Sequence, residues 1–463
     1  MEEIIATHLA NSSHDRIDAS ARHATKHHIL HTLMCAAAGS KAPGIAPLLE
    51  LACESGGEGK SSVVVHGAKL PAMHAAMVNS SMAHAQDFDL NDDRTFYKSS
   101  VTAVPTGFAV AEELGGVHGT ELLTAICAGI DFGIRIGLGV LPKPAHARSQ
   151  MIGGFASVAT AGRLLKLDGE QMLDALGIVY CQVAAGGSSN DSPALTKRLA
   201  PGLSARAGVF SARLAQKGFK SARGVLSGKR GYFQLNHGRE GDLEAITSEL
   251  AQRWEVVNVG PKGYPCCRVL HAPIDATLAA VKEHDIRAEE VERVLVRGSA
   301  SNIFISTGGK APVSFHKYRH PIGVVDAQFS VHWGVAAAIA RKSVFIDCFT
   351  EDALTDPVIN QLTDRIELIA DPSLDPVDDL LAPAVVEITT KSRGVFKSRA
   401  DFAKGNPKNP VTWDETVAVL HRSAPFMAYP IPARKLETLV SLVADLEHIG
   451  DVSALIANLI RDR

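Results

Sequence analysis

Four aspartates lie close together in the segment HAQDFDLNDDRTFYKSS, which spans residues 84–100. They are Asp87, Asp89, Asp92 and Asp93, and the segments on either side have apolar residues at helical spacing. Carboxylates of this kind can accept a proton, orient a lysine or bind a cation. A charged run between helices is usually a solvated loop, and we expect that of Asp92 and Asp93. The chemistry open to Asp87 and Asp89 depends on the cations that lie near them.

An EF-hand calcium loop is excluded at this segment. Counted from Asp87, such a loop needs glycine at its sixth position and glutamate at its twelfth, but Asp92 and Lys98 stand there. Magnesium held by one or two carboxylates stays open as an alternative. The sequence has no HExxH motif and no paired Cys/His zinc spacing. We therefore expect no metal and no cofactor.

A first group of cations follows a glycine- and serine-rich stretch, in GGSSNDSPALTKRLAPGLSARAG at residues 186–208. Lys197 and Arg198 come just before Pro201 and Gly202, which we expect to open a helix. Backbone N–H groups at a helix start favour an anion, and the two cations would add positive charge. The alternative is a pair of exposed cations near a helix end.

A second group lies in GPKGYPCCRVLHAPIDA at residues 260–276, where Lys262, Arg268 and His271 occupy a loop that runs into a helix. Arginine is the natural bidentate partner of a carboxylate. The alternative is again a surface loop. A third group, FHKYRH at residues 315–320, is the densest cationic cluster of the chain, and together the three would make a pocket for a multiply charged carboxylate.

Other catalytic motifs are absent. ESGGEGKSS at residues 54–62 resembles a phosphate-binding loop, but Glu54 stands where the first glycine is required. No GxSxG nucleophile motif occurs. The histidines are scattered, and we expect His27 and His28 to be surface or core residues rather than ligands.

The composition narrows the class of protein. The 463 residues are 46% hydrophobic and 21% charged, with a net charge of −3, which argues against a nucleic-acid-binding face. No apolar run reaches the ~18 residues of a membrane span. The start of the sequence is acidic and lacks the features of a signal peptide. Seven scattered cysteines indicate reduced thiols. We expect a cytoplasmic protein without a membrane or nucleic-acid partner.

The elements that position these residues fall into two groups. Helical periodicity dominates the first two-thirds of the chain, and its many alanines and glycines should let helices approach closely. After residue 265 the pattern of apolar residues changes. Apolar and polar residues alternate in VERVLVRGSA and AVVEITTKSRGVFKSRAD, as they do in strands. We expect a mainly α protein with an α+β second domain: a helical domain of residues 1–265 with a C-terminal return at 405–463, and a lid domain of residues 266–404.

Four blocks together resemble the MmgE/PrpD family, in the order in which that family has them: HAQDFD at 84–89, TKRLAPGLSARAG at 196–208, KGYPCCRVLHAPIDA at 262–276 and RHPIGVVDAQFS at 319–330. Members include 2-methylcitrate dehydratase, cis-aconitate decarboxylase and iminodisuccinate epimerase. The resemblance covers nearly the whole chain. It implies a large helical domain, a smaller α+β lid, a cleft between them, a homodimer, and no cofactor in most members.

The resemblance also implies which residues form the site. By match, Asp87 and Asp89 carry over as active-site loop residues, Lys197 and Lys262 as substrate-facing cations, and Tyr318 with them. Lys98, which lies where the family has another residue, joins these five as a catalytic candidate. The cationic segments themselves, rather than a match to the family, add Arg198, Arg268, His271 and Arg319 as residues expected to bind the substrate, and His146 is a further candidate. The expected substrate is a small di- or tricarboxylate.

Three histidine positions of the dehydratases and decarboxylases differ in this chain. Lys98 or Ser99 stands where a histidine after the aspartate loop is expected, and Ala200 stands after the Thr-Lys block. A third histidine would fall on Ala147, with His146 one residue away. The usual acid/base set is therefore altered.

Family members remove a proton from a carbon next to a carboxylate. A lysine among other cations has a lowered pKa and can act as the base. Dehydration also needs a proton donor for the leaving hydroxyl, and histidine is the natural donor. Because epimerisation needs only two acid/base groups, the altered histidines favour an isomerase that epimerises an iminodisuccinate-like dicarboxylate. The alternatives are a lyase, acting as dehydratase or decarboxylase, and a non-catalytic protein that binds a polycarboxylate.

Overall fold

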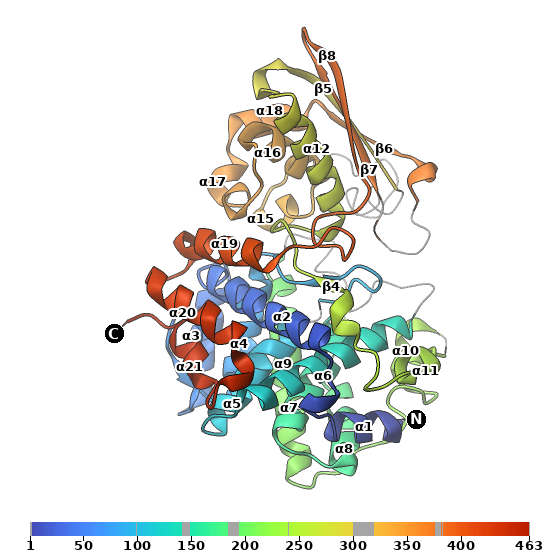
Figure 1. Cartoon of the computed structure of the whole chain (residues 1–463), viewed down its shortest axis with the longest axis vertical. Coiled ribbons are helices and arrows are strands. Elements are labelled where there is room, and N and C mark those ends of the chain that lie inside the picture. The colour runs from blue at the N-terminus through green and yellow to red at the C-terminus, as the bar shows by residue number, and fades with distance from the viewer. Residues whose placement is uncertain are drawn as a thin grey trace. The chain divides into compact units, whose positions relative to one another are not determined.

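The computed structural model of the protein describes residues 2–98, 100–140, 149–183, 194–238, 240–299, 319–375, 381 and 383–462. The chain forms two compact units (Figure 1). Unit 1 comprises residues 1–186, 196–261 and 412–463, and unit 2 comprises residues 187–195 and 262–411. The fold class is as predicted, since helices dominate unit 1 and unit 2 combines helices with a four-stranded sheet. A lid that closes over the helical domain stays a prediction.

Unit 1 is built almost entirely of helices. Its helices are α1 (Glu2–Ala10), α2 (Ala19–Ala38), α3 (Ile45–Gly56), α4 (Ala72–Ala85), α5 (Ser100–Glu113), α6 (Gly119–Leu138), α7 (Ser149–Leu164), α8 (Gly169–Tyr180), α9 (Thr196–Gln216), α10 (Tyr232–His237), α11 (Leu243–Thr247), α19 (Trp413–Ser423), α20 (Ala433–Ala444) and α21 (Ser453–Ala457). Four two-residue strands accompany them: β1 (Ser61–Ser62), β2 (Lys69–Leu70), β3 (Asn91–Asp92) and β4 (Val259–Gly260).

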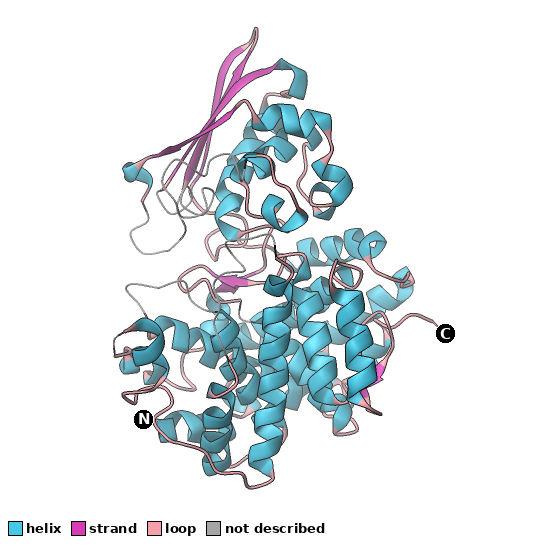
Figure 2. Ribbon diagram, turned by 180° about the vertical axis from the view of Figure 1, so that it is seen from behind, coloured by secondary structure: helices cyan, strands magenta, loops and turns pink. Residues whose placement is uncertain are grey.

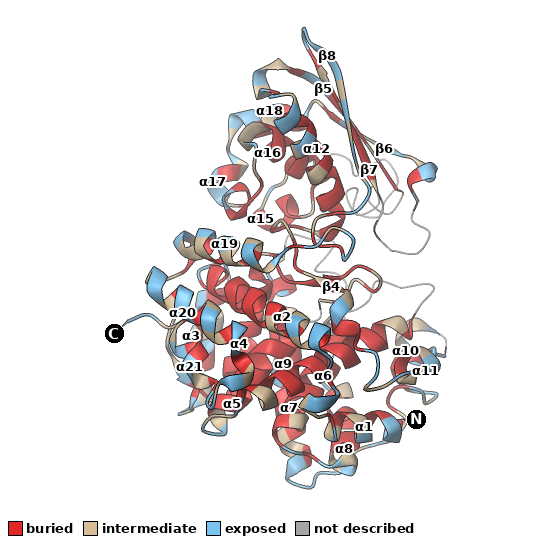
Figure 3. Cartoon of the chain, in the orientation of Figure 1, coloured by how far each residue is buried: buried red, intermediate tan, exposed pale blue. Residues whose placement is uncertain are grey.

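The centre of unit 1 is the packing of α9 against α4, α5 and α7. These helices are mostly buried (Figure 3), and small residues allow their close approach, as the sequence predicts. A Cβ atom added at Gly202 of α9 would overlap the Ser81 hydroxyl and the Met77 carbonyl of α4. One added at Gly208 would overlap Ser157 of α7. The glycines thus set the distance between α9 and its neighbours.

A side chain of α4 replaces the hydrogen bond that a proline removes from α5. Pro105 has no N–H group to bond the carbonyl of Val101 one turn earlier. The hydroxyl of Ser80 on α4 donates to that carbonyl instead, at 2.6 Å. This contact fixes α5 against α4 at the start of the helix that follows the aspartate loop.

The C-terminal segment completes unit 1 by packing on α2. The Thr416 hydroxyl lies 2.6 Å from Nε2 of His27, and the Ser423 hydroxyl donates to the Met34 sulfur at 3.4 Å. Lys26 forms an ion pair with Glu447 at 3.0 Å. Residues more than 380 positions apart in sequence therefore share one core.

Unit 2 is a sheet with helices on one face. Its strands are β5 (Val291–Gly298), β6 (Ile366–Ala370), β7 (Ala384–Thr390) and β8 (Gly394–Ala400), in the order β6-β5-β7-β8. The β5–β6 pair is parallel, the β5–β7 and β7–β8 pairs are antiparallel, and β7 and β8 form the predicted hairpin. Helix α12 (His271–Glu283) packs against β7 and β8, and α16 (Val331–Arg341) packs against α12 (Figure 2). The described residues of unit 2 also form the shorter helices α15 (Val324–Ala327), α17 (Glu351–Leu354) and α18 (Pro357–Thr363).

Candidate active site

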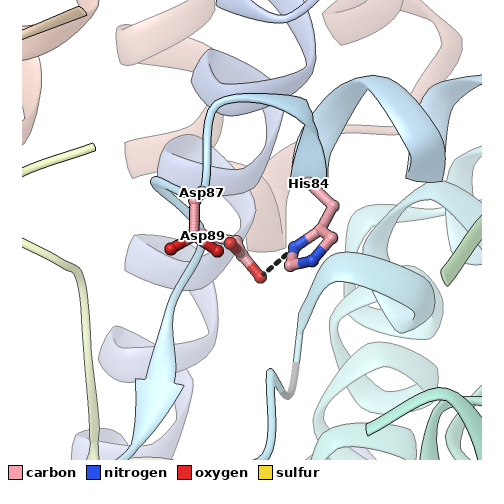
Figure 4. Close-up of side chains that lie close together, drawn as sticks. All are labelled: His84, Asp87 and Asp89. Carbon is pink, nitrogen blue, oxygen red and sulfur yellow. Dashed lines mark hydrogen bonds and ion pairs between the residues drawn. The ribbon is translucent and has the colours of Figure 1, made fainter. Parts of the chain in front are cut away.

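The last turn of α4 and the loop after it bring three polar side chains together. His84 lies in that turn, Asp87 follows with a positive φ of 50°, and Asp89 precedes strand β3. Aspartate tolerates this left-handed conformation better than most residues. Nδ1 of His84 lies 3.0 Å from Oδ2 of Asp89 (Figure 4). All three side chains are buried, with 5%, 2% and 0% exposed.

Lys197, in the first turn of α9, joins this group from a distant part of the sequence. Its Nζ atom lies 2.7 Å from Oδ1 of Asp87 and 3.2 Å from Nε2 of His84. Lys197 is itself buried, with 7% exposed. The result is a chain of contacts from Asp87 through Lys197 and His84 to Asp89. We call these four residues the lysine–histidine cluster.

The contacts assign the tautomer of His84. The ammonium of Lys197 can only donate a hydrogen bond, so Nε2 of His84 accepts. Nδ1 then carries the hydrogen and donates it to Asp89. Burial is the main cause that lowers the pKa of His84 below its ordinary 6.5; Asp89 opposes this shift and Lys197 adds to it. His84 is therefore a neutral hydrogen-bond acceptor for Lys197 at neutral pH.

Ligand atoms of His84, Asp87 and Asp89 lie within 4.8 Å of one another, which is close enough to hold a metal ion. The Lys197 ammonium already bonds both Asp87 and His84 in that space. A divalent ion there would have to displace or repel this ammonium. The residues therefore fit a lysine as the resident cation better than they fit a metal.

The other two aspartates of the loop contradict the expectation that they are solvated. Asp92 and Asp93 are 0% and 3% exposed. Asp92 forms an ion pair with Arg94 at 2.6 Å and accepts hydrogen bonds from the backbone N–H groups of Arg94 and Thr95. Arg94 reaches on to Glu255 at 2.8 Å. These carboxylates hold the loop in shape rather than face water.

His31 of α2 supports the same loop from the other side. Its Nε2 lies 2.8 Å from the carbonyl oxygen of Phe88, the residue between Asp87 and Asp89. The rings of His31 and Phe88 also pack edge to face. His31 therefore fixes the backbone from which both aspartates project. His27 and His28, expected to be surface or core residues rather than ligands, are both buried.

The helix that carries Lys197 starts earlier than predicted. We expected Pro201 and Gly202 to open it, but α9 begins at Thr196 and Pro201 lies inside it. Pro201 lacks the N–H that would bond the Lys197 carbonyl in a regular helix. Lys197 and Arg198 are also buried rather than exposed, and Arg198 donates to the carbonyl of Pro43 at 3.0 Å. The described contact of Arg198 is thus structural, and its substrate-binding role stays a prediction.

Lys98 lies at the end of the aspartate loop and is partly buried. Its Nζ donates to the carbonyl of Phe96 at 3.3 Å. Its catalytic role stays a prediction. His146 and Tyr318 lie outside the described residues.

The remaining predicted residues belong to unit 2. Lys262, Arg268 and His271 are buried, so the surface-loop alternative is wrong for them. Arg268 bonds Nδ1 of His271 at 3.0 Å and donates to the carbonyls of Ala403 and Lys404. Arg319 donates to the carbonyl of Asp364 at 3.2 Å. Their roles toward a substrate stay predictions.

His84 is not among the site residues predicted from the sequence. A signal was present, because His84, Asp87 and Asp89 are spaced so that the end of a helix can bring all three to one place. Its partner Lys197, however, lies 113 residues away. That contact follows from the packing of α9 on α4, which periodicity alone does not give.

Comparison with known proteins finds relatives that match most of the chain. Cis-aconitate decarboxylase of Aspergillus terreus is 25% identical over 96% of this chain and 93% of its own length. A cis-aconitate decarboxylase-like protein of Aspergillus oryzae is 24% identical over 95% of this chain and 93% of its own. Human cis-aconitate decarboxylase is 25% identical over 84% of this chain and 79% of its own.

Two family domains match the sequence in succession. The MmgE/PrpD N-terminal domain matches residues 3–241, which include the whole lysine–histidine cluster. The MmgE/PrpD C-terminal domain matches residues 264–439, which include Arg268 and His271. Among the described residues, no helix has the length and apolar character needed to cross a membrane. The chain belongs to the MmgE/PrpD family.

Proposed function

We propose that the protein is a cofactor-independent lyase that decarboxylates a small unsaturated tricarboxylic acid of the cis-aconitate type. The observation that carries this proposal is the contact of the buried Lys197 ammonium with both Asp87 and the neutral imidazole of His84. The similarity to cis-aconitate decarboxylases over nearly the full chain supports the choice of reaction.

Decarboxylation replaces carbon dioxide by a proton, so the site needs a proton donor held next to a carbon atom. The electron pair of the breaking carbon–carbon bond is taken up by the neighbouring double bond, whose far carbon then receives the proton. Lys197 is placed to give that proton, because Asp87 and His84 fix the direction of its ammonium. The amine that remains regains a proton from water.

His84 has a positioning role in this scheme. Neutral and hydrogen-bonded to Asp89, it accepts from Lys197 and limits the rotation of the ammonium. It also supplies a histidine to a chain in which three expected histidine positions are altered. This weakens the sequence argument that a lyase would lack a suitable acid/base partner.

Epimerisation of an iminodisuccinate-like dicarboxylate is the second candidate. It is favoured by the resemblance, which puts Lys98 or Ser99 where the dehydratases and decarboxylases are expected to have a histidine. Two lysines on opposite faces of one carbon would suffice for inversion. A homodimer in the cytoplasm, as the sequence suggests, is compatible with either reaction.

The deciding experiment is proton NMR of the purified protein in deuterium oxide with cis-aconitate, 2-methylcitrate and one enantiomer of iminodisuccinate. We expect carbon dioxide release from cis-aconitate and one deuterium in the product. Alpha-carbon exchange with inversion of iminodisuccinate would replace the lyase by the epimerase. An alkene formed from 2-methylcitrate would indicate a dehydratase, and no change in any acid would leave the non-catalytic binder. Lys197→Met should abolish turnover, whereas Lys217→Met, an exposed lysine just beyond α9, should not.

A further inference from the structure

Helix α9 packs against α4, α5, α7 and α8, and one side of it remains in solvent. The free side of a surface helix is usually polar. On α9, however, Leu203 and Phe210 are 46% and 43% exposed, and Leu199 and Leu214 are partly exposed. Large apolar side chains that gather on one face, rather than occur singly, are typical of a surface that another molecule covers.

The four apolar side chains lie on a single line along the helix. With 3.6 residues per turn, positions 199, 203, 210 and 214 point within about 60° of one another, over a length of about 22 Å. We call these four residues the apolar stripe of α9. Leu203 and Phe210 form its centre, and Leu199 and Leu214 form its ends.

Two arginines on the same side of α9 are drawn away from the stripe. The Nε of Arg213 donates to Glu113, the last residue of α5, at 2.9 Å. Arg206 lies near His74 of α4, since its charge adds to the effect of burial in lowering the pKa of that histidine. Both cations thus lean toward neighbouring helices of unit 1. The face is therefore a poor match for a nucleic acid or an anionic membrane, which bind rows of available cations.

The spacing of the stripe is the same when it is read in either direction. Leu203 and Phe210 lie equally far from its middle, and so do Leu199 and Leu214. A second copy of α9, packed antiparallel about a twofold axis, would therefore place Leu203 of each copy against Phe210 of the other. The ends of the stripe would pair in the same way. Twofold interfaces require this kind of self-complementary surface.

We propose that the apolar stripe of α9 is an interface with a second copy of this chain, in which the two α9 helices pack antiparallel about a twofold axis. The contact removes the four apolar side chains of each copy from water. It also holds α9, whose first turn carries Lys197, on the side that unit 1 leaves open. The inference goes beyond the expected homodimer, because it names the residues and the geometry of the contact. It does not depend on the proposed reaction.

The first test is sedimentation velocity over a range of protein concentrations. Wild-type protein should be a dimer. Leu203→Glu combined with Phe210→Glu should raise the dissociation constant at least about 100-fold, because each change occurs twice in a twofold dimer and affects the centre of the interface. The melting temperature of the dissociated variant should reveal a folded monomer, since both side chains are exposed in the single chain. Leu235→Glu changes a residue of α10 that is 63% exposed, and this control should leave the dimer intact.

The second test is a disulfide formed by Leu203→Cys together with Phe210→Cys. Within one helix these positions are about 10 Å apart, which is too far for a disulfide. Oxidation should therefore give a covalent dimer that joins position 203 of one copy to position 210 of the other. Peptide mapping distinguishes this bond from any that the exposed Cys53 or Cys181 forms.

Two results would overturn the inference. A monomeric wild-type protein would exclude a second copy as the molecule that covers the stripe. A dimer that persists in the double glutamate variant and forms no bond between positions 203 and 210 would place the interface on another surface. Turnover of the candidate acids is measured separately, so either result leaves the proposed lyase standing.

Discussion

The ammonium nitrogen of Lys197 lies 3.2 Å from Nε2 of His84, in a site where both side chains are buried. Two nitrogens at this distance must divide the roles of donor and acceptor. Lysine donates, so the imidazole is neutral and turns its other nitrogen toward Asp89. One contact therefore fixes a protonation state, a tautomer and the direction of a cation.

Removing the histidine should lower the rate more than the affinity. His84→Asn shortens the side chain and removes the acceptor that orients Lys197. We expect kcat to fall by about 10²-fold, the lower range for a misplaced acid/base group, with KM changed far less. His84→Gln, whose amide oxygen can accept in place of Nε2, should recover part of the rate. Equal rates for wild type, His84→Asn and the exposed control His448→Gln would contradict the positioning role.

Breaking the buried ion pair should destabilise the fold. Asp87→Asn leaves the Lys197 ammonium without its carboxylate at 2.7 Å. The free energy of unfolding should fall by about 3 kcal/mol, as for other buried pairs that lose one partner. Lys197→Met combined with Asp87→Asn should recover part of that loss, because neither charge remains. Urea denaturation measures all three variants, and strictly additive losses would show that the two residues do not interact.

The spacing of α9 from α4 should be sensitive to a single methyl group. Gly202→Ala places a Cβ atom on the Met77 carbonyl and the Ser81 hydroxyl, so α9 must move and carry Lys197 with it. We expect the free energy of unfolding to fall by about 1–3 kcal/mol, which is typical of overpacking. The turnover rate should fall by a larger fraction of its wild-type value than the free energy of unfolding does. Gly450→Ala meets nothing within 4 Å and is the control. Full activity in Gly202→Ala would show that the distance between α9 and α4 does not control the position of Lys197.

Acid should weaken unit 1 through the histidines of α2. Burial lowers the pKa of His27 to about 3 and that of His28 to about 4, from 6.5. Below pH 6.5 the unfolded chain binds protons that the folded chain does not, so stability falls as the pH falls toward 4. Each histidine contributes a slope of up to about 1.4 kcal/mol per pH unit.

Replacing both histidines by residues that do not titrate, as in His27→Gln with His28→Asn, should flatten that slope. The expected change is seen in unfolding free energies measured from pH 7 to pH 4.5, whatever the loss of stability at pH 7. The double variant of the exposed His118 and His448 is the control for general effects of charge. If the slope of unfolding free energy against pH is unchanged in the His27/His28 double variant, the acid sensitivity comes from other residues.

Sequence patterns predicted the elements better than the contacts between them. Alternation in residues 384–400 predicted the β7–β8 hairpin, since both strands and their turn are local. Helical periodicity and small residues predicted the packed helices of unit 1. Pro201 misled the prediction of where α9 begins, because a proline near the first turn reads as a start signal even when the helix extends before it.

The site itself was only half visible in the sequence. Asp87, Asp89 and Lys197 were identified by resemblance, but the burial of Asp92 depends on Arg94 and its contact with Glu255, 161 residues further on. The bond from His84 to Lys197 likewise depends on two helices that pack only in the folded chain. Local charge patterns describe an isolated loop, whereas these residues acquire their state from partners that the loop does not contain.

The separation of unit 1 into three stretches of sequence has a consequence for synthesis. Residues 262–411 of unit 2 leave the ribosome before residues 412–463, which supply Thr416 and Ser423 to α2. The helical unit therefore remains open until the last tenth of the chain has emerged, while most of its apolar surface already exists. Nascent chains stalled at Val411 should be cut by protease throughout residues 1–261 and spared within 262–411. Residues 1–261 are made first, but they become stable last because their core needs residues 412–463.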